Sequence, residues 1–258
     1  MSPTLRPIMA NSPYLIIIAL GAVVPAVVTN LYHIQVMIFI GIYIILTLSL
    51  NLLNGYVGLL SIGHAAFYGI GAYASAKLVM EVGLPFPLAM LGAGAVAGIC
   101  GYLIAKPTLR LSGIYMTLAT LGFNMIFFLI LQNWMSFTNG PLGIMDIPPP
   151  NIFGYEIETR VQYYYLIYFL VLLTIVSMHR LMTCRFGRAL VSIRENELAA
   201  EAMGVHTTRY KTQAFVLAAF YAGIAGSYYA HFVNYVSPDR FYIYDSFILL
   251  AMLAFGGQ

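Results

Sequence analysis

The chain has 258 residues, of which 61% are hydrophobic and only 8% are charged, and its formal net charge is +3. Soluble domains carry about 25% charged residues, so this composition excludes an ordinary soluble domain and indicates an integral membrane protein. The basic residues lie at the ends of apolar runs, so nucleic-acid binding is not predicted. Strand-like segments of alternating hydrophobicity are absent, which favours α-helical spans over a barrel.

Seven apolar runs long enough to span a hydrocarbon core follow one another along the chain. They cover residues 14–28, 33–53, 64–80, 88–105, 114–135, 161–182 and 213–236. An eighth run begins near Asp245 and reaches Gln258 without a polar flank. We therefore expect a single all-α transmembrane domain, a polytopic bundle of about eight spans, with an incomplete C-terminus. The first run is predicted to be a retained span, since no small-residue cleavage site precedes a short apolar core.

The distribution of Lys and Arg predicts the orientation, because cytoplasmic loops carry the excess of these residues. With the N-terminus in the cytoplasm, the cytoplasmic side holds Arg6, Lys106, Arg110, Arg180, Arg185, Arg188, Arg194, Arg209 and Lys211, and the outer side holds Lys77, Arg160 and Arg240. The polar loop 183–212 is then cytoplasmic, and loop 136–160 faces outward. The Pro148–Pro150 run in the outer loop cannot be helical and predicts a stiff, extended cover.

Pairs of small residues predict where helix backbones approach one another in lipid. The chain has three pairs of small residues with three residues between the members of each pair: Gly94 and Gly98, Ala65 and Gly69, and Ala222 and Gly226. The two cysteines, Cys100 in a span and Cys184 in the polar loop, are expected at different depths, so a disulfide is not predicted.

The Gly-rich segment 51–73 lies between two spans, yet it is too apolar for an ordinary loop. Irregular backbone at membrane depth is tolerated only where protein or a water-filled cavity surrounds it. One interpretation is a broken helix that lines a substrate path; the other is a packed turn in which the histidine is simply hydrogen-bonded. The candidate lining residues are Asn54, Gly55, Gly58, Ser61, Gly63 and His64. A lone histidine does not predict a metal site.

The loop 183–212 contains a short amphipathic pattern. Leu198, Ala199, Ala202, Met203 and Val205 fall on one helical face, and Arg194, Glu197 and Glu201 fall on the other. Gly204 is expected to end the helix. A helix over 194–203 is about 15 Å long and too polar to span, so it lies along the cytoplasmic face. It either anchors the loop at the membrane surface or is offered to a soluble partner.

The spans carry no Asp, Glu, Lys or Arg near their centres, although proton- and ion-coupled carriers usually need such groups. Phosphate-binding loops and hydrolase motifs are absent as well. We therefore expect no catalytic residue, no metal and no cofactor on this chain, and any ATP-driven work must use a partner.

Two sets of residues resemble a known family. The stretch from Leu198 to Gly204 resembles the "EAA" loop of bacterial ABC importer permeases, which reads Glu-Ala-Ala, three residues, then Gly. Leu198 stands where that Glu would fall, and Glu197 lies one position earlier. Segments 51–73, 109–123, 133–144, 186–211 and 237–257 resemble the LivM type of branched-chain amino acid permease, and the resemblance covers about residues 35–257.

The resemblance implies a transmembrane subunit of an ATP-driven importer in the bacterial inner membrane, surrounded by membrane lipid. Its partners would be a related permease subunit, two ATP-binding cassette subunits that hold ATP and Mg, and a periplasmic amino-acid-binding protein. Residues 194–204 would be the coupling helix, its polar face toward an ATPase subunit. Its coupling residues would be Arg194, Glu195, Asn196, Glu197, Ala200, Glu201 and Gly204. A cysteine at Ala200 would then be labelled from the cytoplasm.

Three alternatives remain open at this stage. Related permeases for urea or short amides share the fold and several motifs, so the motifs alone do not separate them from amino acid permeases. An ion-coupled secondary carrier would transport without an ATPase, and a membrane enzyme would need buried acid–base pairs that the spans lack.

Overall fold

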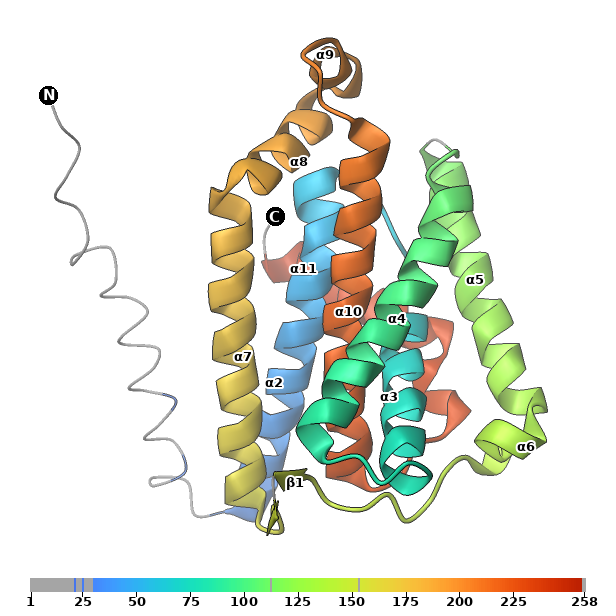
Figure 1. Ribbon diagram of the computed structural model, residues 1–258, viewed down its shortest axis with the longest axis vertical. Helices are drawn as coiled ribbons and strands as arrows, with labels where there is room; N and C mark the ends of the chain where they lie inside the picture. The colour runs from blue at the N-terminus through green and yellow to red at the C-terminus, as the bar shows by residue number, and fades with distance from the viewer. Residues whose placement is uncertain (1–20, 22–24, 26–29, 112, 153, 257–258) are drawn as a thin grey trace, which may run out of the picture.

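The computed structural model describes residues 21, 25, 30–111, 113–152 and 154–256. Its described part is a bundle of helices that run nearly side by side (Figure 1). The long helices are α2 (Leu31–Asn51), α3 (His64–Met80), α4 (Phe86–Thr108), α5 (Ile114–Asn133), α7 (Arg160–Thr183) and α10 (Thr207–Val233). Shorter elements are η2 (Leu52–Val57), α6 (Met135–Thr138), η3 (Gly140–Leu142), α8 (Arg185–Glu195), α9 (Glu197–Ala202), η4 (Pro238–Phe241) and α11 (Ile243–Gly256).

Five helices in the described part are long and apolar enough to cross a membrane. They are Leu31–Val57, which joins α2 and η2, together with α4, α5, α7 and α10. The expected count of eight spans is not confirmed. The predicted run 14–28 lies outside the continuously described residues. The run 64–80 forms the 17-residue α3, which is at the lower limit of the length of a span and is not among the five. Helix α10 begins at Thr207, six residues before the predicted start at 213. Its first turns are polar, and an apolar run therefore does not reveal them.

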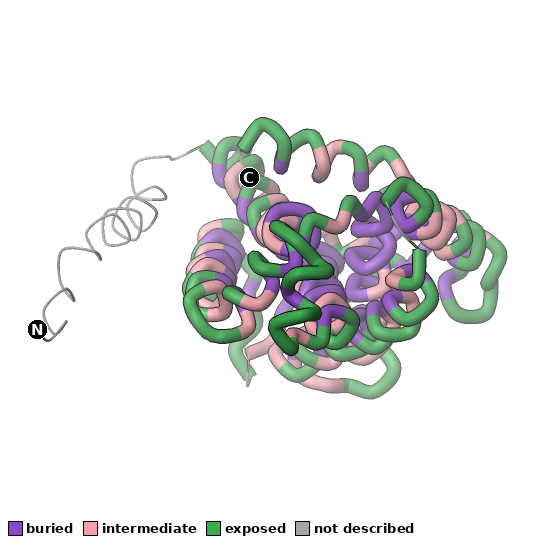
Figure 2. Tube along the Cα trace, turned by 90° about the horizontal axis from the view of Figure 1, so that it is seen from above, coloured by how far each residue is buried: buried purple, intermediate pink, exposed green. Residues whose placement is uncertain are grey.

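The bundle is centred on α10, which packs between α3 and α4 through small residues. A methyl group on Gly226 would collide with the backbone of Tyr68 in α3, and one on Gly71 would collide with the backbone of Gly223. On the other side of α10, a Cβ on Gly223 would lie 2.6 Å from that of Ala97 in α4. These contacts confirm that small residues of α10 let neighbouring helix backbones approach it closely. Buried residues gather in the middle of the bundle (Figure 2).

The segment 136–160 closes one end of the bundle. The Pro148–Pro150 run is not helical, as predicted, and leads into a hairpin of β1 (Asn151–Ile152) and β2 (Tyr155–Glu156). His231 Nδ1 lies 2.8 Å from the Pro148 carbonyl oxygen, and Asn234 Nδ2 donates to the Ile147 carbonyl at 2.7 Å. The segment is therefore held across the end of α10 rather than hanging free.

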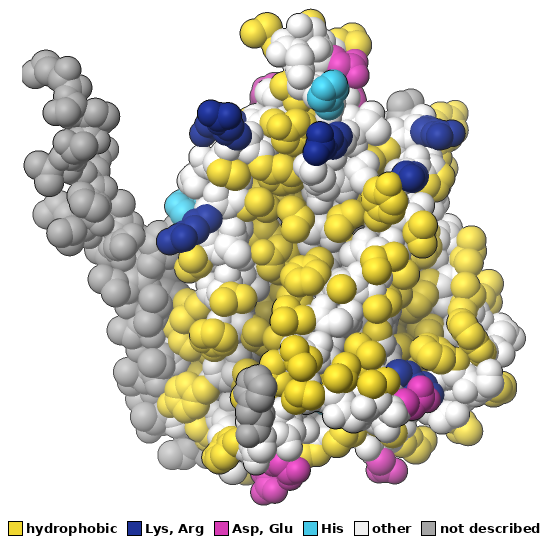
Figure 3. Space-filling model, in the orientation of Figure 1, with side chains coloured by type: hydrophobic (Ala, Val, Ile, Leu, Met, Phe, Trp, Pro, Cys, Tyr) yellow, Lys and Arg dark blue, Asp and Glu magenta, His cyan; other side chains and the backbone are white. Residues whose placement is uncertain are grey.

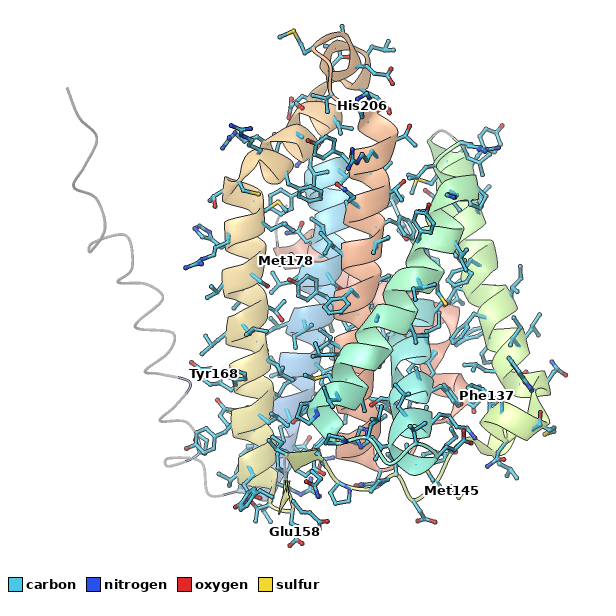
Figure 4. The ribbon with its side chains drawn as sticks, in the orientation of Figure 1. Phe137, Met145, Glu158, Tyr168, Met178 and His206 are labelled. Carbon is cyan, nitrogen blue, oxygen red and sulfur yellow. The ribbon has the colours of Figure 1, made fainter. Side chains whose placement is uncertain are left out.

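The two ends of the bundle differ in charge. The end that carries α9 also carries the last turns of α4 and α7 and the first turn of α10, and most Lys and Arg side chains on the visible face gather there (Figure 3). His206 lies at this end, whereas Met145 and Glu158 lie at the hairpin end (Figure 4). The basic residues that the sequence assigned to the cytoplasm, apart from Arg6, thus share one end of the molecule.

Replacing Gly226 with Ala is expected to destabilise the protein. The added methyl group meets backbone atoms of Tyr68 and Ala72, which cannot rotate away, and overpacking of this kind costs about 1–3 kcal/mol. The measurement is the midpoint of thermal unfolding in detergent. Gly122→Ala in α5 is the matched control, because nothing lies within 4 Å of its Cβ position. Equal midpoints for the two variants would contradict the close packing of α3 against α10.

Candidate functional site

The α2 helix does not end at its last α-helical residue but continues as the wider π-helical turn η2, Leu52–Val57. The element stops at Gly58, whose φ of 77° lies in the left-handed region that glycine adopts without steric cost. Residues 58–63 are not helical, and α3 then begins at His64. The helix is therefore interrupted in the Gly-rich segment, an interruption that both interpretations from the sequence require, and the substrate path stays a prediction. A π-helical turn is a frequent feature of functional sites.

The broken segment is held by hydrogen bonds from its own side chains and from α5. The Ser61 amide donates to Asn54 Oδ1 at 3.2 Å, and the Ile62 amide donates to Thr120 Oγ1 at 3.1 Å. Thr117 Oγ1 donates to the Leu60 carbonyl at 3.0 Å. These bonds supply the partners that the irregular backbone needs at membrane depth.

His64 is fully buried, with its Nε2 2.6 Å from Ser49 Oγ. This is the packed, hydrogen-bonded position that the sequence left open as one alternative. Asn54 and Ser61 are buried as well. Of the candidate lining residues, Gly58 borders a described cavity, and a transport role for the others stays a prediction. Asn54 Nδ2, Ser61 Oγ and His64 Nδ1 are buried without a hydrogen-bond partner among the described residues.

The sequence predicted that the polar segment 183–212 is a loop with one short helix, and the structure differs. It contains two helices, α8 and α9, which meet at Asn196. Asn196 has extended backbone angles, and its Oδ1 accepts a hydrogen bond from the Ala199 amide at 3.0 Å, so it begins α9 as an N-cap. The expected single helix over 194–203 is therefore wrong, because this cap divides it. Gly204, with φ of 85°, follows the end of α9 as predicted.

Helix α8 contacts the broken segment directly. The Arg194 guanidinium donates to the Gly55 carbonyl oxygen of η2, and the Arg194 Cγ lies 3.3 Å from the position of a Cβ on Gly58. Both segments stand out in the sequence, but the contact between them is not predictable from it, since Gly55 and Arg194 are 139 positions apart. The two candidate sites are one structural unit in which the last turn of α8 is bonded to the π-helical turn.

The exposed tip of this unit is apolar. Leu198 is 78% exposed and Met203 is 85% exposed, whereas Ala200 is only 5% exposed. The acidic residues of α9 are bonded within the chain: Glu197 pairs with Lys211, and Glu201 accepts from the Thr207 hydroxyl at 3.3 Å. Glu197 and Glu201 nevertheless remain exposed, so an outward polar face on the helix stays a prediction. The expectation of an accessible Ala200 is corrected, because its side chain is buried.

A groove of about 870 Å³ lies between the broken segment, the turn from α4 to α5, and the α8–α9 junction. Gly58, Thr117, Arg194, Glu197 and Lys211 are among its lining residues. The described residues contain no group of three or more His, Cys, Asp or Glu able to hold a metal ion. The arrangement suits the transmission of movement better than a chemical reaction, because it joins an exposed arm to a break in a buried helix.

Comparison with known proteins decides the family. A family model described as "Branched-chain amino acid transport system / permease component" matches residues 32–258, nearly the whole chain. The chain belongs to this permease family. Its all-α bundle, with helices able to span a membrane, is the fold that membership requires. No solved structure matches the chain.

Curated relatives agree with the family. The chain is 38% identical over 240 residues to the high-affinity branched-chain amino acid transport system permease protein LivM of Salmonella typhimurium, and 37% identical to that of Escherichia coli. Each alignment covers 84% of this chain and 56% of the relative, so the chain spans about half the length of these relatives. A probable LivM of Methanocaldococcus jannaschii is 23% identical, over 87% of this chain and 74% of that protein.

The exposure of α9 predicts how cysteines at its tip will react. With Cys100 and Cys184 replaced, Met203→Cys should react rapidly with a polar maleimide, because its side chain is surrounded by solvent. Ala200→Cys, three positions away and 5% exposed, should react far more slowly. The measurement is the labelling rate of each variant in intact membrane fragments. Equal rates would contradict the packing of α9 on α10.

Proposed function

We propose that this chain is a transmembrane subunit of an ATP-driven importer that carries leucine, isoleucine and valine across the bacterial inner membrane. The proposed complex contains a second related permease subunit, two ATP-binding cassette subunits and a periplasmic amino-acid-binding protein. The observation that carries the proposal is the family match over residues 32–258, which the relatives named LivM support. ATP and Mg are assigned to the cassette subunits, and this chain itself is a permease rather than an enzyme.

The charge of the two ends supports an orientation with α9 in the cytoplasm. Lys106, Arg110, Arg209 and Lys211 lie with α8 and α9 at one end, and the positive-inside rule places such an end in the cytoplasm. The N-terminus is assigned to the same side, and segment 136–160 to the side of the binding protein. A Met203→Cys variant should accordingly be labelled from the cytoplasmic face alone.

The α8–α9 unit is the proposed point of contact with a cassette subunit. Leu198 and Met203 would enter an apolar groove on that subunit, and Asn196 and Gly204 would set the ends of the α9 turn that presents them. Movement of α9 would then pass through α8 and Arg194 to Gly55, and the π-helical turn would rearrange with it. The irregular segment 52–63 would open or close the path, along which a branched apolar side chain needs little polar contact.

Transport by the assembled complex tests the function. The full complex, reconstituted in liposomes with the binding protein, is expected to take up radiolabelled leucine when ATP is present, and isoleucine and valine should compete. Urea and acetamide should not compete. Uptake driven by a proton or sodium gradient without cassette subunits would contradict the proposal, and competition by urea in place of leucine would move the substrate to the amide class.

Arg194→Ala is expected to uncouple ATP hydrolysis from transport. Loss of its bond to the Gly55 carbonyl separates α8 from the broken segment, and coupling energies of this kind correspond to roughly 5-fold or larger effects. The measurement is the ratio of leucine transported to ATP hydrolysed in the reconstituted complex.

Arg185→Ala is the matched control for this prediction. It removes the same charge from the first turn of α8, at the opposite end of that helix from Arg194. Its ratio should equal that of the unchanged protein. An unchanged ratio in Arg194→Ala, with normal assembly, would remove Arg194 from the coupling path while leaving the transport function intact.

A further inference from the structure

A second groove, of about 1110 Å³, lies at the same end of the bundle as α9 and is lined by other residues than the first groove, although both grooves adjoin α9. Its floor is the first half of α10, and its walls come from the last turns of α4 and from the junction of α7 with α8. The lining changes in character along α10. Arg209 lies near the start of the helix, and Val216 and Leu217 lie about 10–12 Å further along it at 1.5 Å per residue.

The outer part of this groove is cationic. Lys106 and Arg209 line it from α4 and α10, and His206 lies between α9 and α10 (Figure 4). The ion pairs of the described residues are Lys77–Glu81 and Lys211–Glu197, so neither Lys106 nor Arg209 is neutralised by a carboxylate there. Glu201, the acidic lining residue, accepts a hydrogen bond from Thr207. Lys106 Nζ lies 4.7 Å from the ring centroid of Tyr102, which holds the ammonium group over the groove.

The inner part of the groove is apolar and continues into the lipid-facing surface. Leu181, Phe186, Val216 and Leu217 line it. On α4, the neighbouring Ile99 and Leu103 are more than half exposed, at 61% and 62%. Figure 3 shows this order on the molecule, with basic side chains near the α9 end and a broad apolar surface next to them.

We propose that this groove binds an anionic phospholipid from the membrane leaflet at the α9 end. Lys106 and Arg209 contact the phosphate, and the first part of an acyl chain lies on Val216 and Leu217. Basic pockets between helices at a membrane surface suit such headgroups. A free phosphate ion would leave the apolar floor without a partner, whereas a zwitterionic lipid would leave the excess positive charge unbalanced.

Bound lipid would contact both ends of the α8–α9 unit. Phe186 belongs to the first turn of α8, and Glu201 and His206 flank the return of the chain from α9 into α10. The lipid would therefore brace the arm against α4 and α10. The binding itself does not depend on the transported substrate or on the cassette subunits.

The test measures phosphatidylglycerol binding to the full chain by native mass spectrometry in a nonionic detergent. The double variant Lys106→Gln/Arg209→Gln should bind the lipid roughly 30-fold more weakly, which corresponds to about 2 kcal/mol for two basic contacts. Phosphatidylcholine should bind the unchanged protein weakly, and the double variant should not alter its binding.

Three comparisons complete the experiment. Arg110→Gln/Arg185→Gln removes the same charge from the same end but outside this groove, and it should bind phosphatidylglycerol as the unchanged protein does. The variant Lys106→Arg/Arg209→Lys keeps both positive charges, and it should bind phosphatidylglycerol as the unchanged protein does. Equal losses in the two glutamine variants would reduce the effect to net charge and overturn the site. Displacement of the lipid by millimolar inorganic phosphate would overturn it as well, since the apolar floor would then contribute nothing.

Discussion

The backbone between Leu52 and Gly63 leaves the α-helical pattern in a chain built for lipid, and each polar group that it frees needs a partner within the protein. Thr117 and Thr120 of α5 supply two of these partners from one side. Arg194 supplies another from the opposite direction, through the Gly55 carbonyl. Helices α5 and α8 thus both meet the break, and their side chains supply hydrogen-bond partners to its backbone.

Rigidity and mobility are divided between two kinds of contact. Helices α3, α4 and α10 meet through glycine and alanine, so their backbones have little freedom to slide without collision. The α8–α9 arm is joined to the bundle by the buried Leu190 and Ile193 of α8 and also by polar contacts, among them the Arg194 hydrogen bond and the Glu197–Lys211 pair. Long charged side chains can change partners at modest cost, whereas packed backbones cannot. The polar contacts of the arm can therefore exchange partners more easily than the packed contacts of the core.

The sequence identifies Leu198 as a departure from the "EAA" pattern, but it does not show where the Leu198 side chain lies. It departs from the Glu of the "EAA" pattern, and on sequence alone that departure only weakened the match. In the structure Leu198 is 78% exposed at the tip of α9, while Glu197 is turned to Lys211. The acidic group is thus used within the chain, and an apolar side chain is left for contact with a partner. The groove lined by Lys106 and Arg209 was not foreseen either, because its residues come from five separate helices.

The sequence by itself determined the membrane class, the family, the positions of most helices, the non-helical Pro148–Pro150 run and the irregular character of the Gly-rich segment. These features follow from local composition and from glycine and proline, whose conformational preferences act within a few residues. Only the tertiary structure decided that Asn196 divides segment 183–212, that Ala200 is buried, and that Arg194 meets Gly55. The Arg194–Gly55 contact joins residues 139 positions apart, which no local pattern can pair. The Asn196 cap is a local bond to the Ala199 amide, and the amphipathic pattern alone did not separate it from a continuous helix over 194–203.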